Sequence, residues 1–175
     1  MCSLRPRITT ALTAVAASLD VAGVEWLLAG GTARALSGWR HDPGDIDIEI
    51  SAHSAEGGAA ALDLPLRDEG DGRSRSMRAT GMVCDVAVDL TSDLEVEGAG
   101  GRLAPDFPLQ RTFARSVELG GRRLWIAPIE EAVARALVRG DWGSLARLAA
   151  EAPRDAELRA AYLSLRLAAA VRAAR

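Results

Sequence analysis

Three acidic residues alternate with isoleucine in one short segment, which reads Asp45-Ile46-Asp47-Ile48-Glu49-Ile50. Successive side chains of a β-strand point to opposite faces, so the carboxylates are expected on one face and the isoleucines on the other. Neighbouring carboxylates repel one another unless water or a cation neutralises them. We expect Mg²⁺ in this role, with Mn²⁺ as the alternative, because Mg²⁺ prefers carboxylate oxygens and substrate phosphates.

Two glycines and a threonine precede this segment by about a dozen residues. The apolar run from Val24 to Ala29 predicts a buried strand, and Gly30 and Gly31 allow the backbone to turn tightly and to approach a ligand closely. Thr32 is expected to cap a short helix that ends at Leu36 or Ser37. Backbone amides at such a turn favour phosphate oxygens. Gly30, Gly31 and Thr32 are therefore predicted to bind a phosphate-bearing ligand.

Together, Gly30-Gly31-Thr32 and Asp45-Ile46-Asp47 resemble the signature of the nucleotidyltransferase superfamily that includes DNA polymerase β. The Gly-Gly-Thr-Ala form is most similar to minimal nucleotidyltransferases, which include the aminoglycoside nucleotidyltransferases and the AbiEii-type components of toxin–antitoxin systems. The resemblance covers roughly residues 24–90. It implies an α+β fold, with a small mixed β-sheet flanked by helices, and a site in which Asp45 and Asp47 hold two Mg²⁺ ions.

The same resemblance implies a third carboxylate on the strand beside this one. Residues 75–79 and 82–90 read as a hairpin with its turn at Thr80-Gly81, and Asp85 and Asp89 would share the appropriate face. We prefer Asp85, because the family places this aspartate about four residues after the hairpin glycine. Asp45, Asp47 and Asp85 then form the predicted catalytic and metal-binding set, with Asp89 as the alternative. Glu49 shares the face but lies beyond the usual pair.

Two arginines flank the expected triphosphate site. Arg40 stands five residues before Asp45, where related sequences often carry an arginine, and a guanidinium can hold phosphate oxygens in a fork. Arg40 is therefore predicted to bind the nucleotide. Arg34 is a weaker candidate, and His41 is expected on the loop surface.

The rest of the chain frames this site. Residues 6–22 read as an amphipathic helix that stops at Gly23, residues 91–108 as a long acidic loop, and residues 117–126 as a second hairpin. Pro128 is expected to begin a helix with an apolar stripe of Ile129, Val133, Ala136 and Leu137. Two Ala- and Leu-rich helices follow, separated by Pro153. We therefore expect a catalytic domain over residues 1–127 and a C-terminal helical segment over residues 128–175, which packs on that domain, a second copy or a partner protein.

Bulk properties narrow the function. The 175 residues carry a net charge of −3, which argues against a broad nucleic-acid-binding surface. The two cysteines, Cys2 and Cys84, suggest neither a disulfide framework nor a zinc site, so a reducing cytoplasm is the expected location. No stretch reads as a membrane span.

The sequence thus predicts a Mg²⁺-dependent nucleotidyltransferase. It would transfer a nucleoside monophosphate from a nucleoside triphosphate to a hydroxyl group of an acceptor. The residues do not define that acceptor, which could be a small hydroxylated molecule, an RNA or a protein. The alternative is a catalytically weak binding module that acts with a partner protein, as in toxin–antitoxin systems.

Overall fold

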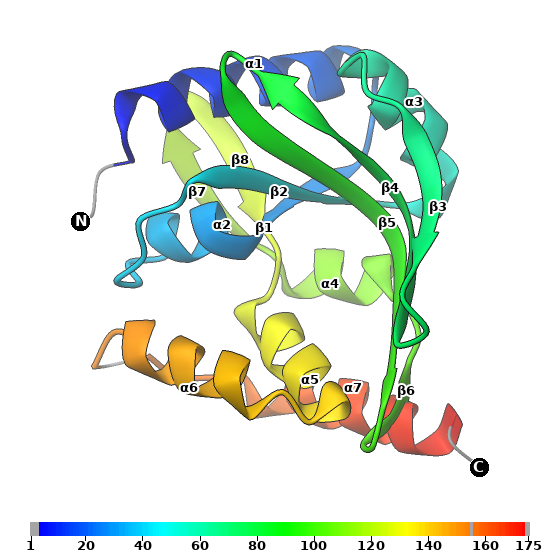
Figure 1. Cartoon of the computed structure of the whole chain (residues 1–175). Helices are drawn as coiled ribbons and strands as arrows, with labels where there is room; N and C mark the ends of the chain where they lie inside the picture. Colours follow the sequence, from blue (N-terminus) through cyan, green and yellow to red (C-terminus); the bar gives the residue numbers. More distant parts are fainter. Residues whose placement is uncertain (1–3, 155, 174–175) are drawn as a thin grey trace.

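The computed structural model describes residues 4–154 and 156–173. Eight strands in this part of the chain form one mixed sheet in the order β3-β4-β5-β2-β1-β8-β7, and β6 pairs with the distal end of β5 (Figure 1). β2 runs parallel to β5 and antiparallel to β1, whereas β1 runs parallel to β8. The strands are β1 (Trp26–Ala29), β2 (Asp45–Ile50), β3 (Leu66–Gly70), β4 (Ser74–Val83), β5 (Val86–Gly98), β6 (Gly101–Leu103), β7 (Arg115–Leu119) and β8 (Arg122–Ile126).

Helices lie on both sides of this sheet. Figure 1 shows α1 and α3 on one side and α5, α6 and α7 on the other, so the expected α+β class is confirmed. No helix among the described residues is long and apolar enough to cross a membrane. The helices are α1 (Pro6–Val21), α2 (Gly30–Leu36), α3 (Ala55–Ala61), α4 (Phe107–Phe113), α5 (Ile129–Arg139), α6 (Trp142–Glu151) and α7 (Ala160–Ala173), with one 3₁₀ turn at Ala52–Ser54.

The alternation in β2 orients the site. Ile46, Ile48 and Ile50 are at most 2% exposed and belong to the core that α1 and α3 cover. Burying each such side chain contributes about 1.5–3 kcal/mol, so a one-residue slip of β2 would be strongly unfavourable. The expected division of faces is therefore confirmed, and Asp47 and Glu49 face the opposite side of the sheet.

A second apolar cluster joins the distal ends of β5 and β6 to the C-terminal helices. Its buried members are Val96, Leu103, Ala134, Val138 and Ala170. The β5–β6 turn packs directly on the backbone of α5, because a Cβ atom added to Gly98 would lie 2.3 Å from the Val138 carbonyl oxygen. Helices α5 and α7, which follow residue 127, therefore pack directly against strands β5 and β6 of the sheet.

The hairpin prediction was wrong about the position of the turn. β4 runs through Thr80 and Gly81, and the two-residue turn is Cys84-Asp85, with φ angles of 47° and 59°. Turns with positive φ at both central residues match the twist of paired strands, and aspartate tolerates this conformation better than most residues. The sequence signal at Gly81 was misleading, because this glycine instead makes room for the Leu64 side chain.

Three other local expectations were also wrong. Residues 91–108 are not a loop, because β5 continues to Gly98 and β6 and the start of α4 follow. The helix after β1 begins at Gly30, and Thr32 is no cap, because its hydroxyl donates to the Asp45 carbonyl oxygen at 2.7 Å. The buried face of α5 keeps only Ala136 of the expected stripe and also carries Glu130 and Glu131, because arginines from α5 and from the chain after α6 neutralise these carboxylates.

Candidate active site

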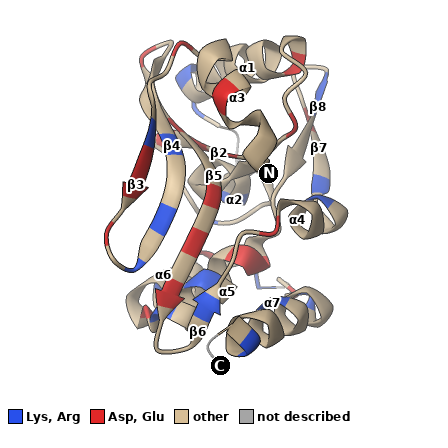
Figure 2. Cartoon of the chain, turned by 90° about the vertical axis from the view of Figure 1, so that its right-hand side faces the viewer, with Lys and Arg blue, Asp and Glu red and all other residues tan. Residues whose placement is uncertain are grey.

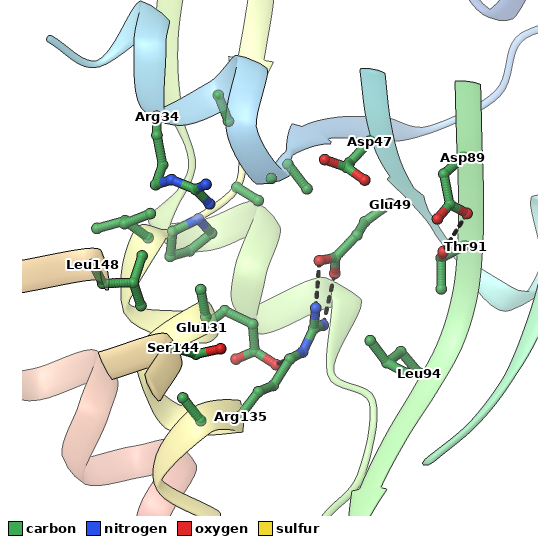
Figure 3. A pocket seen from close by; sticks show the side chains of 18 of the residues that line it. Arg34, Asp47, Glu49, Asp89, Thr91, Leu94, Glu131, Arg135, Ser144 and Leu148 are labelled. Carbon is green, nitrogen blue, oxygen red and sulfur yellow. Dashed lines mark hydrogen bonds and ion pairs between the residues drawn. The ribbon is translucent and has the colours of Figure 1, made fainter. Parts of the chain in front are cut away.

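The acidic face of β2 opens into a cavity of about 560 Å³ between the sheet and helices α5 and α6. Its wall includes Gly30 at the start of α2, Asp47 and Glu49 on β2, and Asp89 on β5. Figure 3 shows Asp47 and Asp89 on neighbouring strands, with Arg135 of α5 reaching up to Glu49.

Asp47 is a half-buried carboxylate whose negative charge is only partly compensated. Burial, followed by the nearby charges of Asp45 and Asp89, raises its pKa from 3.8 to about 6. The Gly31 amide, whose nitrogen lies 3.3 Å from Oδ2 of Asp47, and the charge of Arg34 offset only part of this rise. A site that holds a carboxylate in this state is suited to bind a cation there.

Asp89 lies directly beside Asp47, because the parallel pairing of β2 and β5 places these two residues in register. Adjacent strands are separated by about 4.8 Å, so the two carboxylates can approach a common ligand. Arg78 of β4 binds both oxygens of Asp89, with an Nε–Oδ1 distance of 2.8 Å, and the Thr91 hydroxyl lies 3.3 Å from Oδ1. This hydrogen bond and ion pair raise the pKa of Arg78 above its ordinary value.

The Arg78–Asp89 pair belongs to a row of opposite charges across the outer strands. Figure 2 shows basic positions on β4 between acidic positions on β3 and β5. Arg75 pairs with Asp68 and Arg78 also approaches Glu69, at 2.6 Å and 3.5 Å respectively. Through Arg78, these cross-strand pairs help to fix the orientation of the Asp89 side chain, because paired residues on neighbouring strands lie on the same face.

The third carboxylate of β2 is fully neutralised. Glu49 accepts two hydrogen bonds from Arg135, at 2.7 Å and 2.9 Å, and Arg135 also contacts Glu131 at 3.1 Å. A bidentate contact of this kind fixes both partners. Asp45 is exposed at the start of β2, close enough to Asp47 to affect its pKa. Among the three carboxylates of β2, Asp45 and Asp47 are therefore the two that no arginine in the described part of the chain contacts.

The main role of the two glycines is to leave room for neighbouring side chains rather than to contact a phosphate directly. A Cβ atom on Gly30 would lie 1.7 Å from Oδ2 of Asp47, and one on Gly31 would lie 2.5 Å from Nε2 of His41. Gly30 also has a φ of +56°, which an L-residue rarely adopts. Only Gly30 lines the cavity, whereas Thr32 is fully buried behind it.

Replacing Gly30 with alanine is expected to impair the site through this contact. The new methyl group would displace the Asp47 carboxylate, and the positive φ adds about 1 kcal/mol of strain. We expect a decrease in the free energy of unfolding of about 2 kcal/mol and at least tenfold weaker Mg²⁺-dependent nucleotide binding, measured by chemical denaturation and calorimetry. Gly38→Ala is the matched control, because Gly38 has a φ of +85° but open space around it. If both variants bind nucleotide equally well, the contact with Asp47 is not important.

Among the predicted nucleotide-binding residues, Arg40 lies outside the cavity. Its guanidinium donates to the Ala150 carbonyl oxygen at 2.9 Å and its amide donates to the carbonyl oxygen of Glu151, so it holds the C-terminal end of α6. Arg34 and His41, which the sequence ranked lower, line the cavity instead. Both contact the Glu151 carboxylate, at 3.0 Å and 3.1 Å.

The structure also separates Asp85 from the other predicted carboxylates. Asp85 is exposed in the β4–β5 turn and does not line the cavity, whereas Asp89 does. The cause is the position of the turn, which lies four residues later than expected and therefore includes Asp85 itself. Sequence reasoning did not identify Arg135 and Glu151, because their partners are 86 and 117 residues away and no local pattern connects them.

The chemistry of these donors suits a hard divalent cation. Asp45 and Asp47 offer carboxylate oxygens that no arginine of the described chain contacts, and burial together with the charges of Asp45 and Asp89 raises the pKa of Asp47. Among the described residues, no three acidic, histidine or cysteine side chains form a closed metal-binding group. The remaining ligands of Mg²⁺ would thus be water and substrate, as is usual for this ion.

Comparisons with known proteins agree on the fold. No protein-family model matches the sequence, and no curated protein is significantly similar to it. The structure is similar to that of the "putative nucleotidyltransferase (TM1012)" from Thermotoga maritima, with a TM-score of 0.71 and 20% identity, over 85% of this chain and 94% of that chain. It is also similar to the solution structure of the antibiotic-resistance factor ANT(2″)-Ia, with a TM-score of 0.51 and 17% identity, over 94% and 90% of the two chains. The chain therefore has the nucleotidyltransferase fold.

Proposed function

We propose that this protein is a Mg²⁺-dependent nucleotidyltransferase that transfers a nucleoside monophosphate to an acceptor hydroxyl. The main support is the under-neutralised Asp47, paired in register with Asp89 in a cavity of this fold. The acceptor oxygen forms a bond to the α-phosphorus, the bond from that phosphorus to the pyrophosphate oxygen breaks, and the hydroxyl proton passes to a carboxylate.

Each carboxylate has a distinct part in this proposal. Asp45 and Asp47 would hold Mg²⁺, which supplies positive charge to the triphosphate and to the attacking oxygen. Asp89 would accept the proton of the acceptor hydroxyl, and Arg78 fixes the orientation of its two oxygens. Glu49 would have a structural part, because its partner Arg135 is only 14% exposed and is held by Glu131 as well. Arg78, which binds Asp89, is 42% exposed, so it can release an oxygen of Asp89 to water more readily.

The triphosphate would be held where α2 meets α6. Arg34 and His41 face the cavity there, and Glu151 occupies both of them in the absence of an anionic ligand. Phosphate oxygens can replace this carboxylate, because guanidinium groups bind both in the same fork geometry. These two residues take the part that the sequence assigned to Arg40.

The decisive experiment compares two aspartates of one hairpin. Asp89→Asn is expected to reduce nucleotidyl transfer at least about 100-fold, because it removes the proton acceptor beside Asp47. Asp85→Asn is the matched control and should retain at least half of the wild-type rate, because Asp85 lies exposed in the turn. Mg²⁺-dependent binding of ATP, GTP, CTP and UTP to both variants is measured by calorimetry, and transfer is measured as pyrophosphate release with a panel of alcohols.

Two results would contradict the proposal. If Asp85→Asn is the damaging change and Asp89→Asn is silent, the site is not organised around the β2–β5 pair. If the wild-type protein binds no triphosphate with Mg²⁺, the enzymatic function fails even though the fold remains.

A further inference from the structure

A second cavity lies at the end of the central strands, on the far side of Glu49 and Arg135 from the first. It has a volume of about 490 Å³, which falls within the range of small-molecule sites. Its walls come from the end of β2, the 3₁₀ turn after it, β5 and helix α4. Apolar side chains form much of this wall, namely Ile50, Leu94, Pro105, Phe107 and Pro108.

Two polar groups of this wall have no partner. The Ser92 hydroxyl and the Gln110 side-chain carbonyl oxygen are buried without a hydrogen bond to any residue within 4–154 and 156–173, and each residue is only 2% exposed. Leaving such a group unsatisfied is unfavourable, so native proteins rarely retain one without a reason. Both residues line the second cavity, although their two oxygens lie just beneath its surface. A ligand with a hydroxyl or N–H group would reach them after a small movement of the side chains in this wall.

The two cavities have lining residues in common, and one of these residues contacts a proposed catalytic carboxylate. Glu49, Thr91, Leu94 and Arg135 line both of them. The Thr91 hydroxyl contacts Asp89, the residue that would accept the proton of the attacking hydroxyl. Figure 3 shows Thr91 and Leu94 below Asp89, beside the Glu49–Arg135 pair. A molecule in the second cavity could therefore direct a hydroxyl past Thr91 into the first.

The charges of the second cavity select against a polyanion. Glu25, Glu49 and Asp93 are acidic, and only two arginines line the wall. Arg135 is already held by Glu49 and Glu131, and the Arg111 guanidinium stacks 4.0 Å above the Trp125 ring. Neither cation is available to a phosphate backbone, so an RNA acceptor is disfavoured.

We infer that the second cavity binds the acceptor of the proposed transfer reaction, and that this acceptor is a small, mainly apolar alcohol without negative charge. It carries the reacting hydroxyl and at least one further hydroxyl or N–H group, which donates to the Gln110 carbonyl oxygen. The acceptor role rests on the proposed nucleotidyltransferase function, whereas the binding of such an alcohol does not.

Cyclohexanol and cyclohexane-1,4-diol test this inference, because both are uncharged and they differ by one hydroxyl group. Each is titrated into the ¹⁵N-labelled full chain, and backbone amide shifts are followed by NMR. We expect both to shift the amides of Ser92 and Gln110, and the diol to bind at least fivefold more tightly. In Gln110→Leu, the advantage of the diol should disappear, because the group that receives its second hydroxyl is gone.

Thermal unfolding of the same variant excludes a merely structural role of Gln110. Removing an unsatisfied buried amide should leave Tm unchanged or raise it by a few degrees. Thr112→Val on the exposed side of α4 is the control and should change neither binding nor the preference for the diol. A clear decrease in Tm for Gln110→Leu, or equal binding of the two alcohols to wild type, would overturn the inference.

Triphosphate binding is measured in the same samples to separate the two proposals. If the diol shifts no amide of the second cavity while Mg²⁺-dependent triphosphate binding persists, the acceptor inference is wrong and the proposed function stands. If the diol binds as expected but no triphosphate does, the cavity is a binding site and the nucleotidyl transfer is refuted, together with the acceptor role.

Discussion

Asp47→Asn is expected to reduce nucleotidyl transfer at least about 1,000-fold and, at the same time, to stabilise the protein. The loss of activity follows because Asp47 is the half-buried carboxylate that would hold Mg²⁺ between Asp45 and Asp89. The gain in stability follows because burial and these two neighbours raise the pKa of Asp47 from 3.8 to about 6. Ionising it in the folded state therefore costs free energy at neutral pH, and asparagine avoids that ionisation.

The sign of the pH dependence of protein stability distinguishes the loss of the Asp47 charge from a change in side-chain packing. Between pH 3.8 and about 6 the folded protein binds more protons at Asp47 than the unfolded chain does, so wild-type stability decreases as pH rises through this window. A shift of roughly two units corresponds to about 3 kcal/mol at pH 7.5. Asp47→Asn should recover about 2 kcal/mol, or about 4–8 °C in Tm, and show little gain at pH 4.

Thermal unfolding at pH 4 and pH 7.5, each with and without Mg²⁺, measures these effects. Mg²⁺ should raise the Tm of the wild type but not that of Asp47→Asn, because a ligand stabilises only the state that binds it. Asp45→Asn is the control: Asp45 is exposed, so this variant should lose transfer activity without a comparable gain in Tm. A decrease in Tm for Asp47→Asn at pH 7.5 would show that Asp47 is well compensated, and the cation site should then be abandoned.

The sequence sufficed for the part of this site that a single strand defines. In β2, alternation alone separated Asp47 from Ile46 and Ile48, because a strand has a period of two residues and one face had to be apolar. The pairing of Gly30 with Asp47 was also visible, since the glycine turn and the acidic strand have a characteristic spacing. Their close contact then gives that spacing a physical reason.

The remaining site depended on partners that are distant in sequence. Choosing Asp89 over Asp85 required the position of the β4–β5 turn, and a left-handed Cys84-Asp85 pair gives no such signal. Likewise, Glu131 was not part of the apolar stripe expected in α5. Its burial becomes favourable because Arg135 of the same helix and Arg166, 35 residues later in α7, both contact it.

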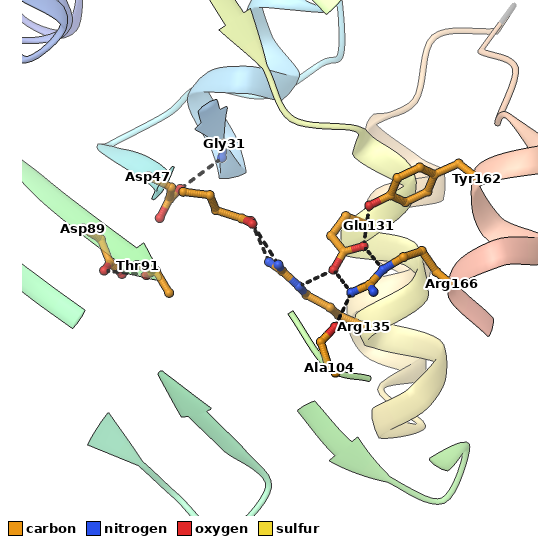
Figure 4. Close-up of polar contacts among 10 residues, drawn as sticks. Gly31, Asp47, Asp89, Thr91, Ala104, Glu131, Arg135, Tyr162 and Arg166 are labelled. Atoms are coloured by element: carbon orange, nitrogen blue, oxygen red, sulfur yellow. Dashed lines mark hydrogen bonds and ion pairs between the residues drawn. The ribbon is translucent and has the colours of Figure 1, made fainter. Parts of the chain in front are cut away.

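Glu131→Gln is expected to be the most destabilising of the polar substitutions considered, at about 3–5 kcal/mol. Glu131 and Arg166 are each 2% exposed, and two hydrogen bonds of 2.7 Å join them. Arg135 and the Tyr162 hydroxyl complete the surroundings of this carboxylate (Figure 4). Removing its charge would leave two guanidinium groups close together in the interior with one negative charge fewer.

The effect should extend to the active site and depend on pH. Arg135 connects Glu131 to Glu49, so loss of the carboxylate should loosen the wall shared by the two cavities. Burial alone would raise the pKa of Glu131, but Arg135, Arg166 and the Tyr162 hydroxyl outweigh it and hold this pKa below 4.5. The stabilisation is therefore complete above about pH 4.5 and is lost as pH falls through the lower folded-state value.

Chemical denaturation of wild type and Glu131→Gln from pH 3 to 8 tests this prediction. The variant should be less stable throughout the neutral range, with a difference that narrows below about pH 4.5 as the wild-type carboxylate becomes protonated. Glu118→Gln is the control, because its pair with Arg123 is more than 60% exposed on both sides and should contribute less than about 1 kcal/mol. Tyr162→Phe, which removes one hydrogen bond to the same carboxylate, should lie between the two. Equal stabilities of Glu131→Gln and Glu118→Gln would mean that this buried network does not hold α7 against the rest of the fold.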